Sequence, residues 1–206
     1  MSSNDKVQKI LHWILDAGIN GLGIIITPAK ELAEEYLEKE DNTEDAINSL
    51  IAWRSTYAAG SGFITGMGGF ASLPLGISAG LAYSYVLAAN TVAAIAYLRG
   101  YDINSEAVKT MILLCLIGEV GVDILEQAGI KIGTKVFQNL INQIPGRVLI
   151  EINKKVGFRL ITKAGEKGVI NLMKIVPLVG GVVSGAVDSQ FVNSCAKTAK
   201  RMLKQA

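Results

Sequence analysis

Residues 55–98, STYAAGSGFITGMGGFASLPLGISAGLAYSYVLAANTVAAIAYL, decide the fold, because none of these 44 residues is Asp, Glu, Lys, Arg or His. Burying an unpaired charge is costly, so a segment without charges can be buried along its whole length. Ser72 as an N-cap and Pro74 in the first turn predict a helix that continues to Arg99. Such a helix is about 38 Å long at the α-helical rise, enough to cross a bilayer or a large protein core.

Small residues recur at every fourth position of this helix, at Ser72, Gly76, Gly80, Ser84 and Ala88. A face of small side chains lets another helix approach the backbone closely. Glycines before Ser72 predict that the first half of the stretch breaks into a glycine turn. The whole stretch is therefore expected to form a helical hairpin. We prefer a hairpin buried against protein, and a hairpin inserted in a membrane is the alternative.

The rest of the chain shows apolar residues at helical spacing and no clean alternation, which predicts an all-α fold. We expect a compact helical bundle built around the glycine-rich apolar helical hairpin. Residues 1–44 are expected to form acidic N-terminal amphipathic helices, and 45–206 the main helical domain with basic C-terminal helices. The two cysteines, Cys115 and Cys195, lie in apolar helical patterns. This placement is typical of reduced packing residues in a cytoplasmic protein and not of a disulfide or a metal site.

A second uncharged segment follows at 175–187, where Pro177 begins a helix and Gly181, Gly185 and Ser189 repeat the small-residue spacing. Its small face is expected to pack against the small face of the 72–88 helix. The residues assigned to these helix-packing motifs are Gly66, Gly68, Gly69, Pro74, Gly76, Gly80, Pro177, Gly180, Gly181 and Gly185.

The net charge of +2 hides a strong asymmetry along the chain. Residues 1–130 carry 7 basic and 15 acidic residues, whereas residues 131–206 carry 13 basic and 3 acidic ones. Such an asymmetry either joins the two halves to each other or directs the basic half to an anionic surface. The basic residues assigned to a lipid- or partner-binding ridge are Lys155, Arg159, Lys163, Lys167, Lys197, Lys200, Arg201 and Lys204.

Three interpretations of this ridge remain open. It is a solvated face paired with the acidic half, a surface for anionic lipid headgroups, or a nucleic-acid site. Headgroup attraction is worth about 1 kcal/mol per basic residue near the surface. Nucleic acid is disfavoured, because aromatic residues make up only 6% of the chain and none alternates with these lysines.

No catalytic residue, metal site or cofactor is expected. His12 is the only histidine, and it has no apparent catalytic partner. The glycine turn at 66–69 could bind an anion, but it lacks the lysine of a phosphate-binding loop, which favours a structural turn. Asp188 is the only acidic residue after Glu166, and either a solvated helix face or a buried ion pair with Arg54 or Arg99 explains it.

Several short motifs resemble the EcsC protein family over roughly residues 45–205. They are TGMGG at 65–69, LP at 73–74, AIA at 94–96, GYD at 100–102, VG at 156–157, RL at 159–160 and IVPLVGG at 175–181, with the helical residues 196–203. The chain departs from this pattern at Val182 and Val183, where a small residue is expected. The resemblance implies an all-helical bacterial domain suspected of membrane association, with no established reaction.

The leading hypothesis is therefore a non-enzymatic protein that associates with an anionic membrane surface through its basic C-terminal helices. Its glycine-rich hairpin is buried in the domain or inserted in the bilayer, where it could perturb the membrane. The alternative is a soluble cytoplasmic module that binds a protein partner or a second copy of itself. The expected location is cytoplasmic, either peripheral to or inserted in the cytoplasmic membrane. No small-molecule substrate is identified.

Overall fold

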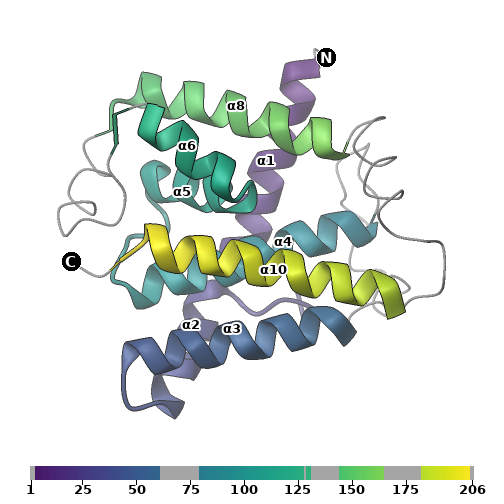
Figure 1. Ribbon diagram of the computed structural model, residues 1–206, viewed down its shortest axis with the longest axis vertical. Coiled ribbons are helices and arrows are strands. Elements are labelled where there is room, and N and C mark those ends of the chain that lie inside the picture. The colour runs from purple at the N-terminus through teal and green to yellow at the C-terminus, as the bar shows by residue number, and fades with distance from the viewer. Residues whose placement is uncertain (1–2, 61–78, 128, 131–143, 165–181, 205–206) are drawn as a thin grey trace.

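The computed structural model describes residues 3–60, 79–127, 129–130, 144–164 and 182–204 (Figure 1). Within these ranges it contains eight helices and no strand, which confirms the all-α prediction. The helices are α1 (Ser3–Asn20), α2 (Ala29–Lys39), α3 (Thr43–Gly60), α4 (Ala79–Leu98), α5 (Glu106–Leu116), α6 (Glu119–Gln127), α8 (Gly146–Ala164) and α10 (Val182–Met202). The predicted glycine turn of the hairpin lies outside the described residues.

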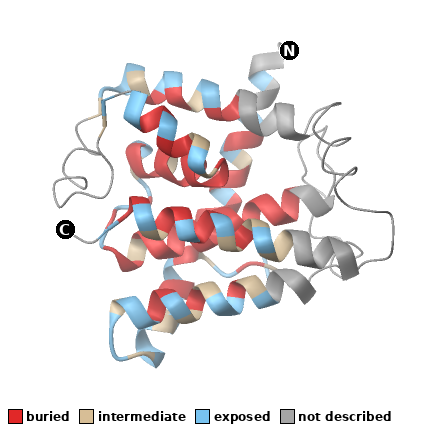
Figure 2. Cartoon of the chain, in the orientation of Figure 1, coloured by how far each residue is buried: buried red, intermediate tan, exposed pale blue. Residues whose placement is uncertain are grey.

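Helix α4 is the centre of the molecule, and it packs against α1, α2, α3, α5 and α10. Every residue from Ala82 to Ala96 is buried, which Figure 2 shows as a red helix behind α10. Residues 82–96 of the uncharged stretch are thus surrounded by protein. Its lack of charge follows from this position, because any charge there would need a buried partner.

Hydrogen bonds define three of the helix ends, each at a residue type that favours such a position. Ser105 caps α5, because its Oγ accepts from the Val108 N–H at 3.3 Å. Gly100 ends α4 with a φ of 81°, and its N–H donates to the Tyr97 carbonyl at 2.8 Å. At the start of α3, Asn42 Oδ1 accepts from the Asp45 N–H at 3.0 Å.

Helix α6 forms in a region rich in glycine, at positions 118, 121 and 129. Gly118 forms the turn between α5 and α6 with a φ of 64°. Gly121 lies inside α6, where a Cβ atom would be 2.2 Å from the Leu114 carbonyl oxygen. The second glycine therefore allows α6 to pack closely on α5 and does not interrupt the helix.

Helix α10 crosses the front of the bundle and packs against α3, α4 and α5 (Figure 1). Helix α10 therefore contacts the central helix. The expected packing of their small-residue faces stays a prediction, because most of these residues lie outside the described ones. At this contact the Ser84 hydroxyl donates to Asp188 Oδ1 at 2.6 Å. The rings of Tyr85 and Phe191 meet edge to face, with centroids 5.3 Å apart.

The acidic N-terminal half and the basic C-terminal half of the chain meet at Glu44. Its carboxylate pairs with Arg99, which directly follows α4, and with Lys200 of α10, the latter at 3.2 Å. Burial alone would raise the pKa of Glu44, but the hydrogen bond from Lys200 and the charge of Arg99 outweigh it, so this pKa is lowered. The charge asymmetry of the sequence therefore contributes to joining the two halves.

Asn90 connects four parts of the fold from inside the core. Arg54 Nη2 of α3 donates to Asn90 Oδ1 at 2.7 Å. The Asn90 amide Nδ2 in turn donates to the Gly18 carbonyl at 2.8 Å and to the Thr27 carbonyl at 2.9 Å. A single fully buried amide thus ties α3, α4, the end of α1 and the loop before α2.

Replacing Gly18 by Ala is expected to destabilise the fold by about 1–2 kcal/mol, although alanine favours a helix. The reason is space, because the added Cβ would lie 2.7 Å from Ala89 Cβ where α1 crosses α4. Urea unfolding followed by circular dichroism measures the change. The matched variant is Gly18→Ala with Ala89→Gly, which removes the 2.7 Å contact and leaves the backbone atoms Ala89 C and Asn90 N at 3.2 Å, so the two substitutions should cost less together than their sum. Strict additivity would contradict this account.

Candidate functional site

The structure places the predicted basic residues on two helices. Lys155 is exposed on α8, and the α10 region contributes the exposed Lys197, Arg201 and Lys204 and the partly buried Lys200. Arg159 and Lys163 belong to α8, but their side chains are outside the described residues. Lys167 is outside them altogether.

The acidic helix α6 lies between these two helices in the view of Figure 1. Helix α5 packs against both α8 and α10. Helix α6 exposes three acidic residues, Glu119, Asp123 and Glu126. The ridge expected from Lys155 to Lys167 stays a prediction, because most of its side chains lie outside the described residues.

On α10, two of the cations are occupied by the protein itself. Lys200 binds Glu44 and also donates to Asn48 Oδ1 at 2.6 Å, and Arg201 Nη2 lies 2.6 Å from Glu119 Oε2. Among the described residues, no ion pair or hydrogen bond involves the ammonium groups of Lys197 and Lys204. Half of the predicted α10 set is therefore structural.

On α8, the described part exposes Arg147, Lys154 and Lys155, and no described carboxylate pairs with any of them. Ile150 lies among them with 57% of its surface exposed. Arg147, Ile150 and Lys154 follow one another at helical spacing, so they share the outward face. Sequence reasoning missed Arg147 and Lys154 because it followed only the four-residue spacing that begins at Lys155.

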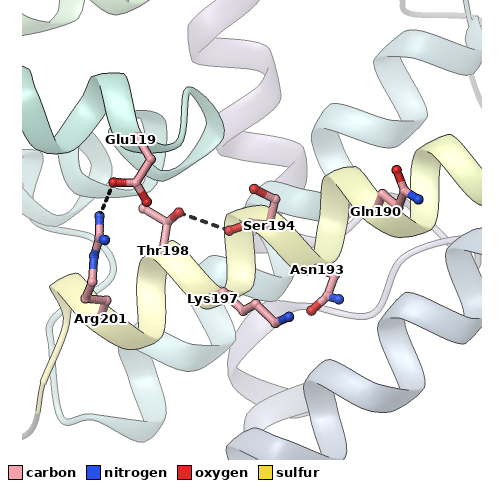
Figure 3. A pocket seen from close by; sticks show the side chains of 7 residues that line it. All are labelled: Glu119, Gln190, Asn193, Ser194, Lys197, Thr198 and Arg201. Atoms are coloured by element: carbon pink, nitrogen blue, oxygen red, sulfur yellow. Dashed lines mark hydrogen bonds and ion pairs between the residues drawn. The ribbon is translucent and has the colours of Figure 1, made fainter. Parts of the chain in front are cut away.

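A shallow polar groove runs along the outward side of α10, next to the start of α6 (Figure 3). Its volume is about 420 Å³. The lining residues are Glu119, Gln190, Asn193, Ser194, Lys197, Thr198 and Arg201. The Thr198 hydroxyl donates to the Ser194 carbonyl at 3.0 Å, so it is engaged within its own helix. The only carboxylate among the lining residues, that of Glu119, forms an ion pair with Arg201. The lining therefore offers polar groups that can bind a ligand, and its carboxylate is not free to act as a base.

Asp188 is half-buried where α10 meets α4, and its carboxylate accepts the hydrogen bond from Ser84. Burial raises the pKa of Asp188 above its ordinary value, although the Ser84 hydrogen bond acts in the opposite direction. Of the two arginines considered as ionic partners, Arg54 donates to Asn90 and Arg99 pairs with Glu44. The partner of Asp188 is therefore the Ser84 hydroxyl and not one of these two arginines.

Both cysteines are free and buried, and burial raises the pKa of the Cys115 thiol. His12 is exposed on α1, where it lines a shallow pocket beside Trp13 and Asp16. In the described ranges, no three His, Cys, Asp or Glu side chains gather in a way that could hold a metal ion.

Most of the predicted glycine and proline packing motif falls outside the described residues. This is the case for Gly66, Gly68, Gly69, Pro74, Gly76, Pro177, Gly180 and Gly181. Gly80 and Gly185 lie in α4 and α10 respectively, and nothing of their surroundings is described. No helix in the described ranges has both the length and the hydropathy of a membrane-crossing segment.

Comparison with known proteins gives one family match. No curated protein and no solved structure matches the chain. The pattern of the EcsC protein family matches residues 5–205, which extends the resemblance seen over 45–205 to include the N-terminal helices. The match thus covers every helix described above, from α1 to α10. The chain belongs to the EcsC protein family.

Proposed function

We propose that this protein associates peripherally with an anionic membrane surface, that α8 is the helix facing the lipid, and that it has no enzymatic activity. The observation that carries the proposal is the outward face of α8. There Arg147, Lys154 and Lys155 are exposed beside the exposed Ile150. Basic side chains attract anionic headgroups, and an apolar side chain among them can enter the boundary between headgroups and acyl chains.

The net charge of α8 also supports this helix as the one that faces the lipid. The helix contains five basic residues, Arg147, Lys154, Lys155, Arg159 and Lys163, against the single acidic residue Glu151. At about 1 kcal/mol per basic residue near the surface, even the three exposed cations of the described part would supply a measurable attraction. The α10 cations contribute less to this proposal because Lys200 and Arg201 hold Glu44 and Glu119.

The position of α4 favours peripheral association over insertion. Five helices cover it, and its residues from Ala82 to Ala96 are buried. Moving α4 into lipid would break the hydrogen bonds of Asn90 with Arg54, Gly18 and Thr27. Peripheral association leaves this core intact.

A second candidate function is a module that binds an acidic protein partner. It is favoured by the internal contacts of α10, where Lys200 and Arg201 already bind carboxylates on two other helices of the same chain. The α8 surface could bind an acidic helix of a partner in the same manner. A loss of binding on charge reversal is expected for both functions. Binding that depends on anionic lipid in vesicles is expected only for the membrane function.

Reversing the charge of α8 with Lys154→Glu and Lys155→Glu is expected to weaken binding to vesicles containing phosphatidylglycerol by at least about thirtyfold. This corresponds to two basic residues at about 1 kcal/mol each, before any added repulsion. Co-sedimentation with vesicles of mixed phosphatidylglycerol and phosphatidylcholine measures the binding. Vesicles of phosphatidylcholine alone should not sediment the protein.

The matched control is Lys30→Glu with Lys39→Glu on α2, which changes the net charge equally at two exposed lysines. This variant should sediment nearly as well as the unchanged protein. If both variants lost vesicle binding equally, the loss would follow from the changed net charge of the protein. That result would contradict a specific role for α8. Unchanged sedimentation of the α8 variant would also overturn the proposal and favour the protein-partner function.

A further inference from the structure

We infer that the polar groove on α10 is a binding site for a small phosphorylated polyol, of which glycerol phosphate is the simplest, either free or as a lipid headgroup. The groove is lined by side chains from α10 and by Glu119 of α6. Its volume of about 420 Å³ is in the range of small-molecule sites and too small for a docked helix.

Hydrogen-bond donors dominate the lining. Lys197 offers three N–H donors, and Arg201 keeps further N–H groups besides those bound to Glu119. Asn193 and Gln190 each add an amide NH₂ group, and Ser194 adds a hydroxyl. The only carboxylate is already paired with Arg201, so the groove carries one excess positive charge. A lining of this kind favours an anionic ligand that is rich in oxygen.

The arrangement of the side chains divides the groove into two parts. In Figure 3, Arg201 points toward Glu119 at one end, whereas Lys197 and Asn193 lie close together on the other side of α10. A phosphate group can accept from the Lys197 ammonium and from the Asn193 amide beside it, because it has several acceptor oxygens, while Arg201 stays paired with Glu119. The Gln190 amide and the Ser194 hydroxyl are then left to pair with hydroxyl groups of the ligand.

The groove is held in shape before any ligand binds. The Arg201–Glu119 contact fixes the guanidinium at 2.6 Å and joins α10 to α6. Helix α10 itself is anchored on α3, α4 and α5. The helix backbone and the Arg201 guanidinium therefore lose little conformational entropy on binding, whereas the exposed Lys197 side chain is ordered only by the ligand.

This inference is independent of the proposed role of α8, because no residue of α8 lines the groove. The decisive measurement is the titration of the full chain with soluble glycerol 3-phosphate by calorimetry, with glycerol as the uncharged comparison. Lys197→Gln is expected to weaken glycerol phosphate binding by at least about tenfold, the loss of one charge-assisted hydrogen bond. The control Lys30→Gln removes an exposed lysine of α2 that does not line the groove, and it should bind like the unchanged protein.

A second experiment, binding to phosphatidylglycerol vesicles, identifies whether the ligand is free or a lipid headgroup. Binding of soluble glycerol phosphate that is sensitive to Lys197→Gln would indicate a free phosphorylated ligand. Binding that depends on Lys197 only with phosphatidylglycerol vesicles would indicate a lipid headgroup. The inference is overturned if Lys197→Gln alters neither glycerol phosphate binding nor vesicle binding, if glycerol competes as well as glycerol phosphate, or if Lys30→Gln causes the same loss. The α8 variants test the membrane proposal separately, so each can fail without the other.

Discussion

Replacing Asn90 by Leu is expected to lower the free energy of unfolding by about 3–5 kcal/mol, the largest effect of any single substitution considered for this protein. Leucine has a similar size but cannot accept the hydrogen bond that Arg54 donates inside the core. It also cannot donate to the carbonyls of Gly18 and Thr27. The substitution therefore costs three buried hydrogen bonds, one of them to a charged group. Urea unfolding followed by circular dichroism measures the loss.

The matched control is Thr91→Val in the next position of α4. Thr91 is also fully buried, but its hydroxyl donates only to the Leu87 carbonyl of the same helix, at 2.8 Å. We expect a cost of about 1 kcal/mol for this variant, because no other helix loses a partner. If Asn90→Leu were no more destabilising than Thr91→Val, Asn90 would not be the connection between helices described here.

The second large effect is expected for Gly121→Ala, at about 3 kcal/mol. The new Cβ would lie 2.2 Å from the oxygen and 2.8 Å from the carbon of the Leu114 carbonyl group. Both are backbone atoms, so the clash cannot be relieved by a side-chain rotation. Helix α6 would have to move away from α5, which opens the buried contacts of Val122 and Leu125.

Gly146→Ala provides the comparison for Gly121→Ala. Gly146 begins α8, and a Cβ atom there would have no neighbour within 4 Å. This variant should stay within about 0.5 kcal/mol of the unchanged protein. The measurement is the midpoint of thermal unfolding of both variants and of the unchanged protein in the same buffer. A similar midpoint for the two would mean that α6 can shift freely, and would contradict the close packing of α6 on α5.

The candidate surfaces were only partly predictable from the sequence. The charge count correctly marked the C-terminal half as basic, and Pro145 directly precedes the first residue of α8. It could not show that Lys200 and Arg201 bind Glu44 and Glu119, since these partners are far away along the chain. Nor could it show that α6 lies between α8 and α10 in the view of Figure 1. The groove on α10 had no sequence signal, because its side chains are ordinary polar residues of an exposed helix face.

Local chemistry by itself determined the helical class, the ends of several helices and the burial of the central one. Ser105, Gly100 and Pro145 act within a few residues of their own position, so their effect can be read directly from the chain. The absence of charge from 55–98 likewise predicts burial, because an unpaired charge there would be costly in any interior. The tertiary structure alone decided what covers that helix and which groups satisfy Asn90, Asp188 and Glu44. Such partners depend on distances between helices that are set only when the whole bundle packs, and no local pattern contains those distances.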